Sequence, residues 1–311
     1  MSRNAAISLV PLACGQPYSL EKRLEEMGAH VGQAATLKSD MVCFPEICNT
    51  LGAPDMWQFE QLDGPTLTAM SKVARKHHLY VVVPLGTMDG GKRRNSSVLI
   101  DRAGKIVGVY HKNVPTHPEL DLGVIPGTET PAFGTDFGRV GLCICFDLDY
   151  WEVGAGLCAS KSELVIWSSM WTGVRMMARW SVEFGFYMAG VSGAGSFVDL
   201  AGRPICSRSN SMTGVAGAAP LVTETLALDR RLLHHDGNLG RLKPLYDKYG
   251  PAAAYAEWLG DECQLVFGSQ LPGVSSDDLI EEFQLEPMRD YLARTRHDRK
   301  RALEGTYPVK K

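Results

Sequence analysis

Several short runs of apolar residues in this chain lack the alternation of polar and apolar positions that marks a half-exposed strand. The clearest are residues 79–86 (LYVVVPLG), 139–146 (RVGLCICF) and 163–169 (ELVIWSS). Strands covered on both faces have this pattern, and they occur mostly where helices cover a sheet. Helical patterns alternate with these runs, for example from Ser19, a predicted N-cap, to Leu37. The sequence therefore predicts an α/β protein with helices packed on mixed sheets.

The remaining pattern predicts one large domain and an extension. Residues 96–112 have two apolar runs joined by the turn residues 101–104, which indicates a β-hairpin. Further helices are predicted at residues 67–78, 150–161 and 174–188, and later strands at 202–209 and 221–229. Beyond residue 250 we find no clear strand, one short apolar region at 263–267, and a charged helical stretch at 277–302 interrupted at Pro287. We therefore predict a domain at 1–250 and a C-terminal extension at 251–311, which packs on the core or on a neighbouring subunit.

Composition excludes several classes of partner. The chain has 311 residues, 45% of them hydrophobic and 22% charged, with a net charge of -3, so neither nucleic acid nor an anionic membrane is expected as a partner. No apolar run approaches the length of a membrane span, and we interpret the N-terminal apolar stretch as a core strand. The eight cysteines lie partly in apolar runs and form no C-x-x-C pair, which predicts no metal site and a reducing cytoplasm.

Three stretches place reactive side chains where predicted buried strands end. Glu46 follows the run that closes with Pro45, Lys112 ends the hairpin strand, and Cys145 lies where the run at 139–146 opens. Functional side chains gather at strand ends in α/β proteins. A thiol is a modest nucleophile until a base or a cation assists it, and a partly desolvated Glu46 beside Cys145 is a suitable base. The spacing alone also permits the bland interpretation of a solvated Glu and Lys and a core cysteine.

The motifs around these residues resemble the carbon–nitrogen hydrolase (nitrilase) superfamily over about residues 5–250. The order Glu, Lys, Cys occurs with the contexts F-P-E, Y-x-K and I-C-F-D. Other matching stretches are the Asn95-Ser96 pair, TDFGRVGLCICFD, Ser169-Met170-Trp171, ARWSVEFGFYMAGVSGAG and GRLKPLY. The resemblance implies an α-β-β-α four-layer sandwich that associates into a homodimer or a larger homo-oligomer.

The resemblance also implies roles for individual residues. Cys145 would be the nucleophile, Glu46 the general base, and Lys112 the group that stabilises the oxyanion, with the backbone N–H of Phe146 as a second donor. Glu119, seven residues after Lys112, would be a second carboxylate that orients Lys112 or the leaving amine. No metal and no organic cofactor is expected.

The chain departs from the family pattern just after the nucleophile, which bears on the substrate. Amide-cleaving members commonly have Cys-Tyr-Asp-x-x-Phe-Pro-Glu-x-x-Arg, but here Trp151 replaces the proline and Ala155 the arginine. Nitrile-cleaving members tend to have Cys-Trp-Glu-Asn, which is absent, although Pro115 and Thr116 resemble the nitrile branch. The residues closest to the nucleophile carry more weight, so a small amide or N-carbamoyl compound is the predicted substrate.

The side chains that line the substrate pocket are harder to choose. Tyr150, Trp171 and Glu183 are candidates, although tryptophans at helix–strand junctions often only pack. Cys143 would share a strand face with Cys145 but lies deeper in the apolar run, so we interpret it as core. Two alternatives stay open: a nitrilase with the same residues, and a ligand-binding member of the fold without catalysis. A weaker one is acyl transfer to an acceptor other than water.

Overall fold

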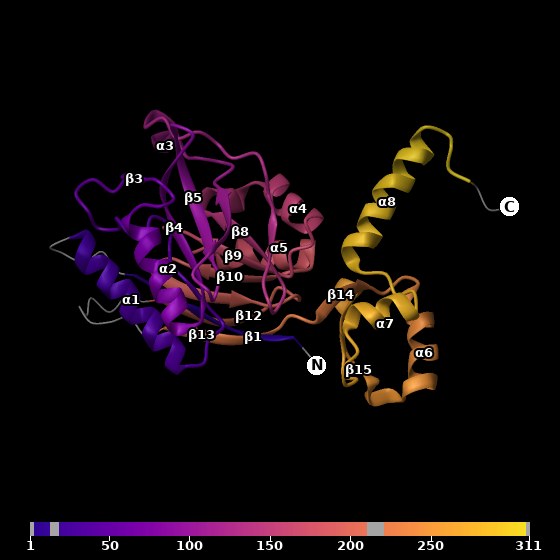
Figure 1. Ribbon diagram of the computed structural model, residues 1–311. Coiled ribbons are helices and arrows are strands. Elements are labelled where there is room, and N and C mark those ends of the chain that lie inside the picture. The colour runs from indigo at the N-terminus through magenta and orange to yellow at the C-terminus, as the bar shows by residue number, and fades with distance from the viewer. Residues whose placement is uncertain (1–2, 13–18, 210–220, 309–311) are drawn as a thin grey trace. The chain divides into compact units, whose positions relative to one another are not determined.

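The structure, a computed structural model, describes residues 3–12, 19–209 and 221–308 and divides into two compact units (Figure 1). The larger unit is Asn4–Leu228, and the smaller contains the residues from Asp229 onward together with Arg3. The boundary predicted near residue 250 therefore lies inside the smaller unit. Each unit has an apolar core of its own.

The first sheet of the larger unit carries two of the predicted reactive residues at one edge. Its strands are β1 (Asn4–Leu9), β2 (Met41–Cys43), β3 (Phe59–Glu60), β4 (Tyr80–Asp89), β5 (Lys92–Ile100), β6 (Ile106–His111) and β13 (Val222–Ala227). Their order is β13-β1-β2-β4-β5-β6, with β3 beside β4. β2 is parallel to β4. β4 pairs antiparallel with β5, and β5 pairs antiparallel with β6, so β6 runs in the same direction as β2 and β4. The chain therefore leaves β2 and β6 at the same edge, where Glu46 and Lys112 follow.

The second sheet carries the predicted nucleophile. Its strands are β7 (Ala132–Gly134), β8 (Arg139–Ile144), β9 (Leu164–Ser168), β10 (Tyr187–Val191), β11 (Ala194–Val198) and β12 (Pro204–Ser209). Their order is β12-β11-β10-β9-β8-β7, with β8, β9 and β10 parallel. Every residue of β9 is buried, as the absence of alternation at 163–169 predicted, and every residue of β10 is buried as well. Cys145 is the first residue after β8.

Helices cover the outer faces of both sheets (Figure 1). Helices α1 (Leu20–Thr36) and α2 (Pro65–His77) pack on the first sheet, and α4 (Trp151–Ala159) and α5 (Val174–Phe184) pack on the second. The inner faces meet: the Tyr110 hydroxyl donates to Asp147 Oδ2 at 2.7 Å, and Ser168 Oγ donates to the Phe44 carbonyl at 3.0 Å. The predicted α-β-β-α sandwich is therefore confirmed.

Helix α1 shows why these segments become helices. Ser19 is its N-cap, as predicted, and its hydroxyl accepts a hydrogen bond from the Lys22 N–H at 3.2 Å. Met27, Val31 and Ala34 follow at helical spacing, and all three are buried against the first sheet. The exposed face is polar, so the burial of the apolar face that contains these three residues determines which side of the helix packs on the sheet.

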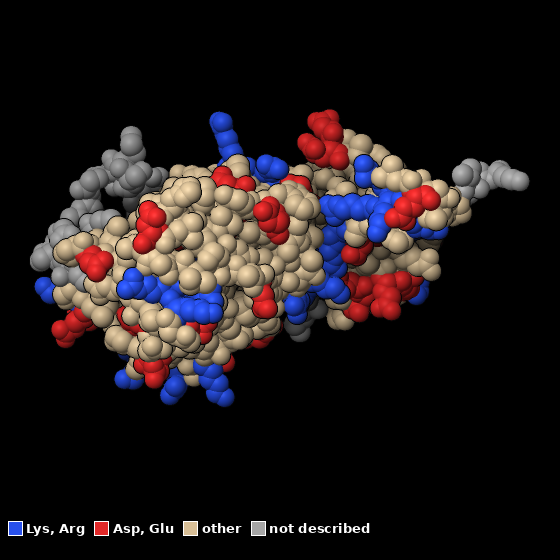
Figure 2. Space-filling view, turned by 90° about the horizontal axis from the view of Figure 1, so that it is seen from above, with Lys and Arg blue, Asp and Glu red and all other residues tan. Residues whose placement is uncertain are grey.

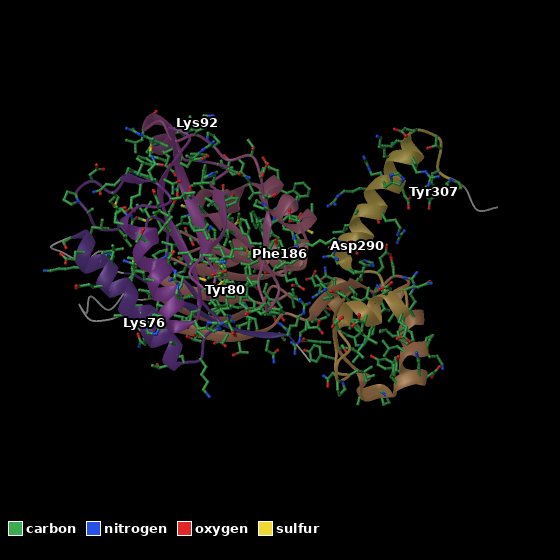
Figure 3. The ribbon with its side chains drawn as sticks, in the orientation of Figure 1. Lys76, Tyr80, Lys92, Phe186, Asp290 and Tyr307 are labelled. Carbon is green, nitrogen blue, oxygen red and sulfur yellow. The ribbon has the colours of Figure 1, made fainter. Side chains whose placement is uncertain are left out.

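The helix predicted at residues 174–188 was too long. Helix α5 ends at Phe184 because Gly185 adopts a left-handed conformation (φ of +72°), and β10 begins at Tyr187. Phe186 lies between them, fully buried and stacked on Phe184 at 5.7 Å between ring centroids (Figure 3). The local pattern concealed the glycine stop because apolar residues continue through it.

The smaller unit contains strands that the sequence did not predict. Its antiparallel sheet has the order β14-β16-β15, formed by β14 (Arg230–His234), β15 (Ala254–Leu259) and β16 (Gln264–Ser269). The expectation of no clear strand beyond residue 250 was wrong, because β15 has no buried residue and no alternation. Helices α6 (Asn238–Tyr249), α7 (Ser276–Glu282) and α8 (Met288–Leu303) complete this unit. The predicted interruption at Pro287 is confirmed, since α8 begins directly after it.

Charges of both signs occur on the visible face of the molecule (Figure 2). Helix α8, which holds the basic run at 294–301, has no buried residue. Its cations have nearby carboxylates: Arg294 Nε lies 2.7 Å from Glu286 Oε1, and Arg301 lies 3.8 Å from Asp298. No helix among the described residues combines the length and the apolar character needed to cross a bilayer.

A test of the packing between α4 and α5 uses two helical glycines. A Cβ at Gly154 would lie 2.3 Å from the ring of Phe184, whereas a Cβ at Gly28 in α1 would meet only Val73, at 3.6 Å. We expect Gly154→Ala to lower the free energy of unfolding by about 1–3 kcal/mol through overpacking. Gly28→Ala should instead raise it by up to about 1 kcal/mol, because alanine is the better helix former. Denaturant unfolding of both variants checks this, and equal stabilisation by both would contradict the packing described.

Candidate active site

A buried lysine between two carboxylates forms the centre of the candidate site. Lys112 Nζ lies 2.9 Å from Glu46 Oε1 and 2.7 Å from Glu119 Oε2. The side chains of Lys112, Glu46 and Glu119 are 1%, 3% and 2% exposed. Burial disfavours the ammonium, but the two carboxylates outweigh it and raise the pKa of Lys112. Three of the predicted residues are therefore brought together, with Lys112 as a permanent cation at neutral pH.

Each member of this cluster is placed by a different element. Glu46 follows β2, and Lys112 continues the ladder between β5 and β6, where its N–H donates to the Asn95 carbonyl at 2.8 Å. Glu119 lies on the short helix α3 (His117–Asp121), directly after the loop that follows Lys112. The N–H and the hydroxyl of Thr116 both donate to Glu119 Oε2 at 2.8 Å. Glu119 is thus part of a capping box as well as a partner of Lys112.

Asn95 joins the two carboxylates and was not predicted as a site residue. Its Nδ2 donates to Glu46 Oε1 at 2.8 Å and to Glu119 Oε1 at 2.7 Å. In the sequence it was only part of the Asn95-Ser96 family match. The signal that could have found it is a buried amide on β5, opposite the residue that ends the hairpin strand.

The predicted nucleophile lies in a strained turn. Cys145 has a φ of +46° and begins the short 3₁₀ helix η1 (Cys145–Asp149). A non-glycine residue rarely adopts this conformation, so surrounding contacts must hold it. One is the indole N–H of Trp167, which donates to the Cys145 carbonyl at 2.9 Å. The residue is 8% exposed, so its environment is mostly desolvated.

The thiol of Cys145 is neutral at physiological pH. Burial, followed by the nearby Glu46 carboxylate, raises its pKa to about 11, against the opposing effects of Lys112, the Met170 N–H and the Ser169 side chain. The cysteine therefore needs a base before it can attack. Glu46 Oε1 accepts both bonds described above, and Glu46 Oε2 accepts none from the described residues.

Asp147 connects the nucleophile turn to the loop after Lys112. Its Oδ2 accepts from the Tyr110 hydroxyl at 2.7 Å and from the Ile144 N–H at 2.9 Å, and its Oδ1 accepts from the Val114 N–H at 2.8 Å. Burial raises the pKa of Asp147 to about 6, despite these donors. In the sequence this residue was only part of the I-C-F-D match.

The predicted pocket residues lie in different surroundings. Phe146, the proposed second oxyanion donor, packs edge-to-face on Tyr150 with ring centroids 5.3 Å apart. Trp171 packs in the same manner on Trp167, at 5.0 Å. These two pairs therefore lie beside the Cys145 turn.

Glu183 lies on α5 and has partners on both α4 and α5. It accepts a hydrogen bond from the indole of Trp151 and lies 3.5 Å from Arg179. Trp151, which departs from the family pattern, is thus the partner of one of the three predicted pocket residues. No contact of Glu183 with the Lys112 cluster is present among the described residues.

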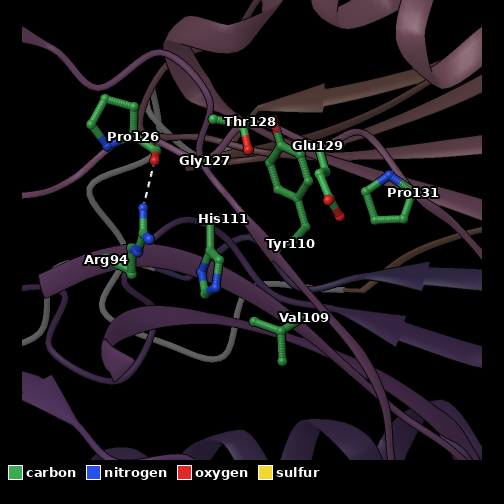
Figure 4. Close-up of a pocket in the computed structure, with 9 residues that line it drawn as sticks. All are labelled: Arg94, Val109, Tyr110, His111, Pro126, Gly127, Thr128, Glu129 and Pro131. Atoms are coloured by element: carbon green, nitrogen blue, oxygen red, sulfur yellow. Dashed lines mark hydrogen bonds between the residues drawn. The ribbon is translucent and has the colours of Figure 1, made fainter. Parts of the chain in front are cut away.

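Two further features lie outside the cluster. Cys143 is fully buried, and burial together with Asp147 raises its pKa well above the usual range, so it is a core thiol. A cavity of about 160 Å³ lies beside β6 (Figure 4), lined by Arg94, Val109, Tyr110, His111, Pro126, Gly127, Thr128, Glu129 and Pro131. None of the predicted catalytic residues lines it.

No group of three or more His, Cys, Asp or Glu side chains in the described part of the chain could hold a metal ion.

Comparison with known proteins places this site in a family. Residues 5–228 match the family model for carbon-nitrogen hydrolases. A Schizosaccharomyces pombe protein named "Probable nitrilase" is 25% identical over 175 residues, which are 54% of this chain and 63% of that protein. An (R)-stereoselective amidase of Pseudomonas sp. is 26% identical over 152 residues, 48% of this chain and 53% of that one. Each match thus spans less than two thirds of the relative's own length.

A solved structure agrees with these matches in fold. The amidase from Nesterenkonia sp. superimposes with a TM-score of 0.60 at 18% identity and covers 72% of this chain and 90% of its own. The matched segment ends where the larger compact unit ends, at Leu228. It contains Glu46, Lys112, Glu119 and Cys145. The chain therefore belongs to the carbon–nitrogen hydrolase family.

Proposed function

We propose that this chain hydrolyses a non-peptide C–N bond in a small amide or N-carbamoyl compound, through a thioester on Cys145. The observation that carries the proposal is that the two carboxylate oxygens of Glu46 have different surroundings. One of its oxygens binds Lys112 and Asn95, and the other is open, near a thiol that is neutral at rest. A neutral thiol beside a carboxylate with a free oxygen suits general-base activation.

The proposed reaction begins with proton transfer from Cys145 Sγ to Glu46 Oε2. The sulfur attacks the carbonyl carbon, and the negative charge that develops on the carbonyl oxygen is stabilised by the Lys112 ammonium and the backbone N–H of Phe146. As the intermediate collapses, the C–N bond breaks and Glu46 returns the proton to the leaving amine. Water then attacks the thioester with Glu46 as base, which releases the acid and restores the thiol.

Glu119 has a different part in this scheme. Its two oxygens accept bonds from Lys112, Asn95 and Thr116. Burial opposes its charge, but Lys112 and these donors hold the pKa of Glu119 below the usual value. A carboxylate so engaged is a poor proton acceptor. We assign it to holding Lys112 toward the oxyanion.

The substrate class and the setting of the enzyme are also part of the proposal. The aromatic pairs of Phe146 with Tyr150 and of Trp167 with Trp171 flank the nucleophile, and we propose Tyr150, Trp171 and Glu183 as pocket residues. A nitrile could be attacked by the same thiol, so nitrilase activity is the second candidate, favoured by the Pro115-Thr116 match. A ligand-binding role without catalysis is the third. We also propose a cytoplasmic homodimer or larger homo-oligomer.

The first test compares Cys145, directly after β8, with Cys143 on β8. Cys145→Ala should lower ammonia or amine release from a panel of small amides, N-carbamoyl amines and nitriles by about 10³-fold or more, because it removes the nucleophile. Cys143→Ala, two residues earlier and buried, should leave kcat/KM within a fewfold of wild type for the folded fraction. The panel also separates amide from nitrile hydrolysis. Equal turnover by wild type and Cys145→Ala on every compound would reject the proposal.

The second test separates the two effects that Glu46 has on the thiol. Glu46→Gln should lower kcat by about 10²- to 10⁴-fold, because the base is lost. The same change removes a negative charge that raises the pKa of Cys145, while the Lys112 cation remains. Alkylation of Cys145 by iodoacetamide, followed by mass spectrometry across pH, should therefore begin at lower pH in the variant. A shift toward higher pH would contradict the electrostatics described.

A further inference from the structure

Asn95 occupies a position that no assigned role explains. It is buried on β5 and has contacts with every charged member of the cluster: its side chain donates to Glu46 and Glu119, and its carbonyl accepts from the Lys112 N–H. The primary amide has two N–H hydrogens, which suffices for one bond to each carboxylate.

The amide is oriented for donation at a cost to its own carbonyl. Asn95 Oδ1 is buried and has no hydrogen-bond partner among the described residues. The opposite orientation would place that oxygen against two carboxylate oxygens. Leaving a buried carbonyl without a donor is unfavourable, so the two bonds to the glutamates determine the orientation.

The charge count shows what these bonds do. Two buried carboxylates share a single ammonium, that of Lys112, so the three groups carry a net negative charge. Two carboxylates that share one ammonium repel each other, and this repulsion favours protonation of one of them. A neutral donor that bonds to both carboxylates stabilises their negative charge without adding a second cation.

We propose that Asn95 is a positioning residue that keeps Glu119 ionised beside the Lys112 ammonium and fixes Glu46 Oε1 through its bond from the amide. Glu46 Oε2 is then the single open proton acceptor. This inference rests on the proposed function, in which Glu46 is the base. The register between β5 and β6 sets the position of Asn95, because Asn95 lies on β5 opposite the end of β6, where Lys112 follows.

The test uses a matched pair of variants on one strand. Asn95→Leu removes the donor at similar size, and Ser97→Ala is the control, because Ser97 lies two residues along the same strand, is equally buried and has no partner for its hydroxyl among the described residues. Asn95→Asp is a third, nearly isosteric variant in case Asn95→Leu folds poorly.

The first readout is thermal stability against pH, which needs no turnover. Carboxylates with a lowered pKa contribute stability above their unfolded pKa and lose it as the pH falls through the folded value. Asn95 is one of the groups that lower the pKa of Glu119. The Tm difference between wild type and Asn95→Leu should therefore be largest near neutral pH and shrink on acidification. The Ser97→Ala difference should not depend on pH.

The second readout is the pH profile of kcat/KM on whichever panel compound the wild type hydrolyses. The acid limb should move up by about one to two pH units in Asn95→Leu, the equivalent of a hydrogen bond to a charged group. In Asn95→Asp, activity should fall as the pH rises and a third carboxylate ionises. Ser97→Ala should keep the wild-type profile.

The outcomes separate this inference from the proposed function. A Tm difference that does not depend on pH in Asn95→Leu, or an acid limb that stays in place in Asn95→Leu together with an Asn95→Asp activity that does not fall as the pH rises, overturns the role of Asn95. A wild type that never exceeds Cys145→Ala overturns the proposed function. In that case a Tm difference that still shrinks on acidification supports Asn95 as a group that keeps Glu119 ionised.

Discussion

The burial of the Lys112 ammonium between Glu46 and Glu119 is the interaction on which the rest of the site depends. An isolated charge in this interior would be strongly unfavourable, and the pair of carboxylates at 2.9 and 2.7 Å makes it tolerable. The three side chains come from three separate elements. The cluster can therefore exist only if the ends of β2 and β6 and the start of α3 meet, which is what the strand order of the first sheet achieves.

The second sheet places the Cys145 thiol near this cluster, where Glu46 and Lys112 both affect its pKa. Cys145 leaves β8 in a left-handed turn, and Trp167 of β9 holds its carbonyl. Asp147 then fastens the same turn to the first sheet through the Tyr110 hydroxyl and the Val114 N–H. Because one carboxylate bonds to both sheets, the distance between the thiol and the Lys112 cluster depends on the packing of the two sheets against each other.

Much of this could be predicted from particular residues. The unbroken apolar runs at 79–86, 139–146 and 163–169 identified covered strands, and Ser19 identified the start of α1. Glu46, Lys112 and Cys145 stood out because each lies where a predicted buried strand ends. The extent of α5 and the strands of the smaller unit escaped, since Gly185 stops the helix inside a continuing apolar pattern and β15 has no buried residue. The pairing of β15 with β16 depends on residues elsewhere in the chain, which the local sequence pattern of β15 cannot identify.

The sequence by itself determined the layered α/β fold and the family, and it singled out Glu46, Lys112, Glu119 and Cys145 as candidate site residues, because apolar patterning and short motifs are local properties of the chain. Only the tertiary structure decided how those residues share charge. It placed Asn95 between the two glutamates, left one oxygen of Glu46 open, and surrounded the Cys145 thiol closely enough to keep it neutral. These properties depend on distances of about 3 Å between side chains far apart in the sequence, and on desolvation, which no local pattern records.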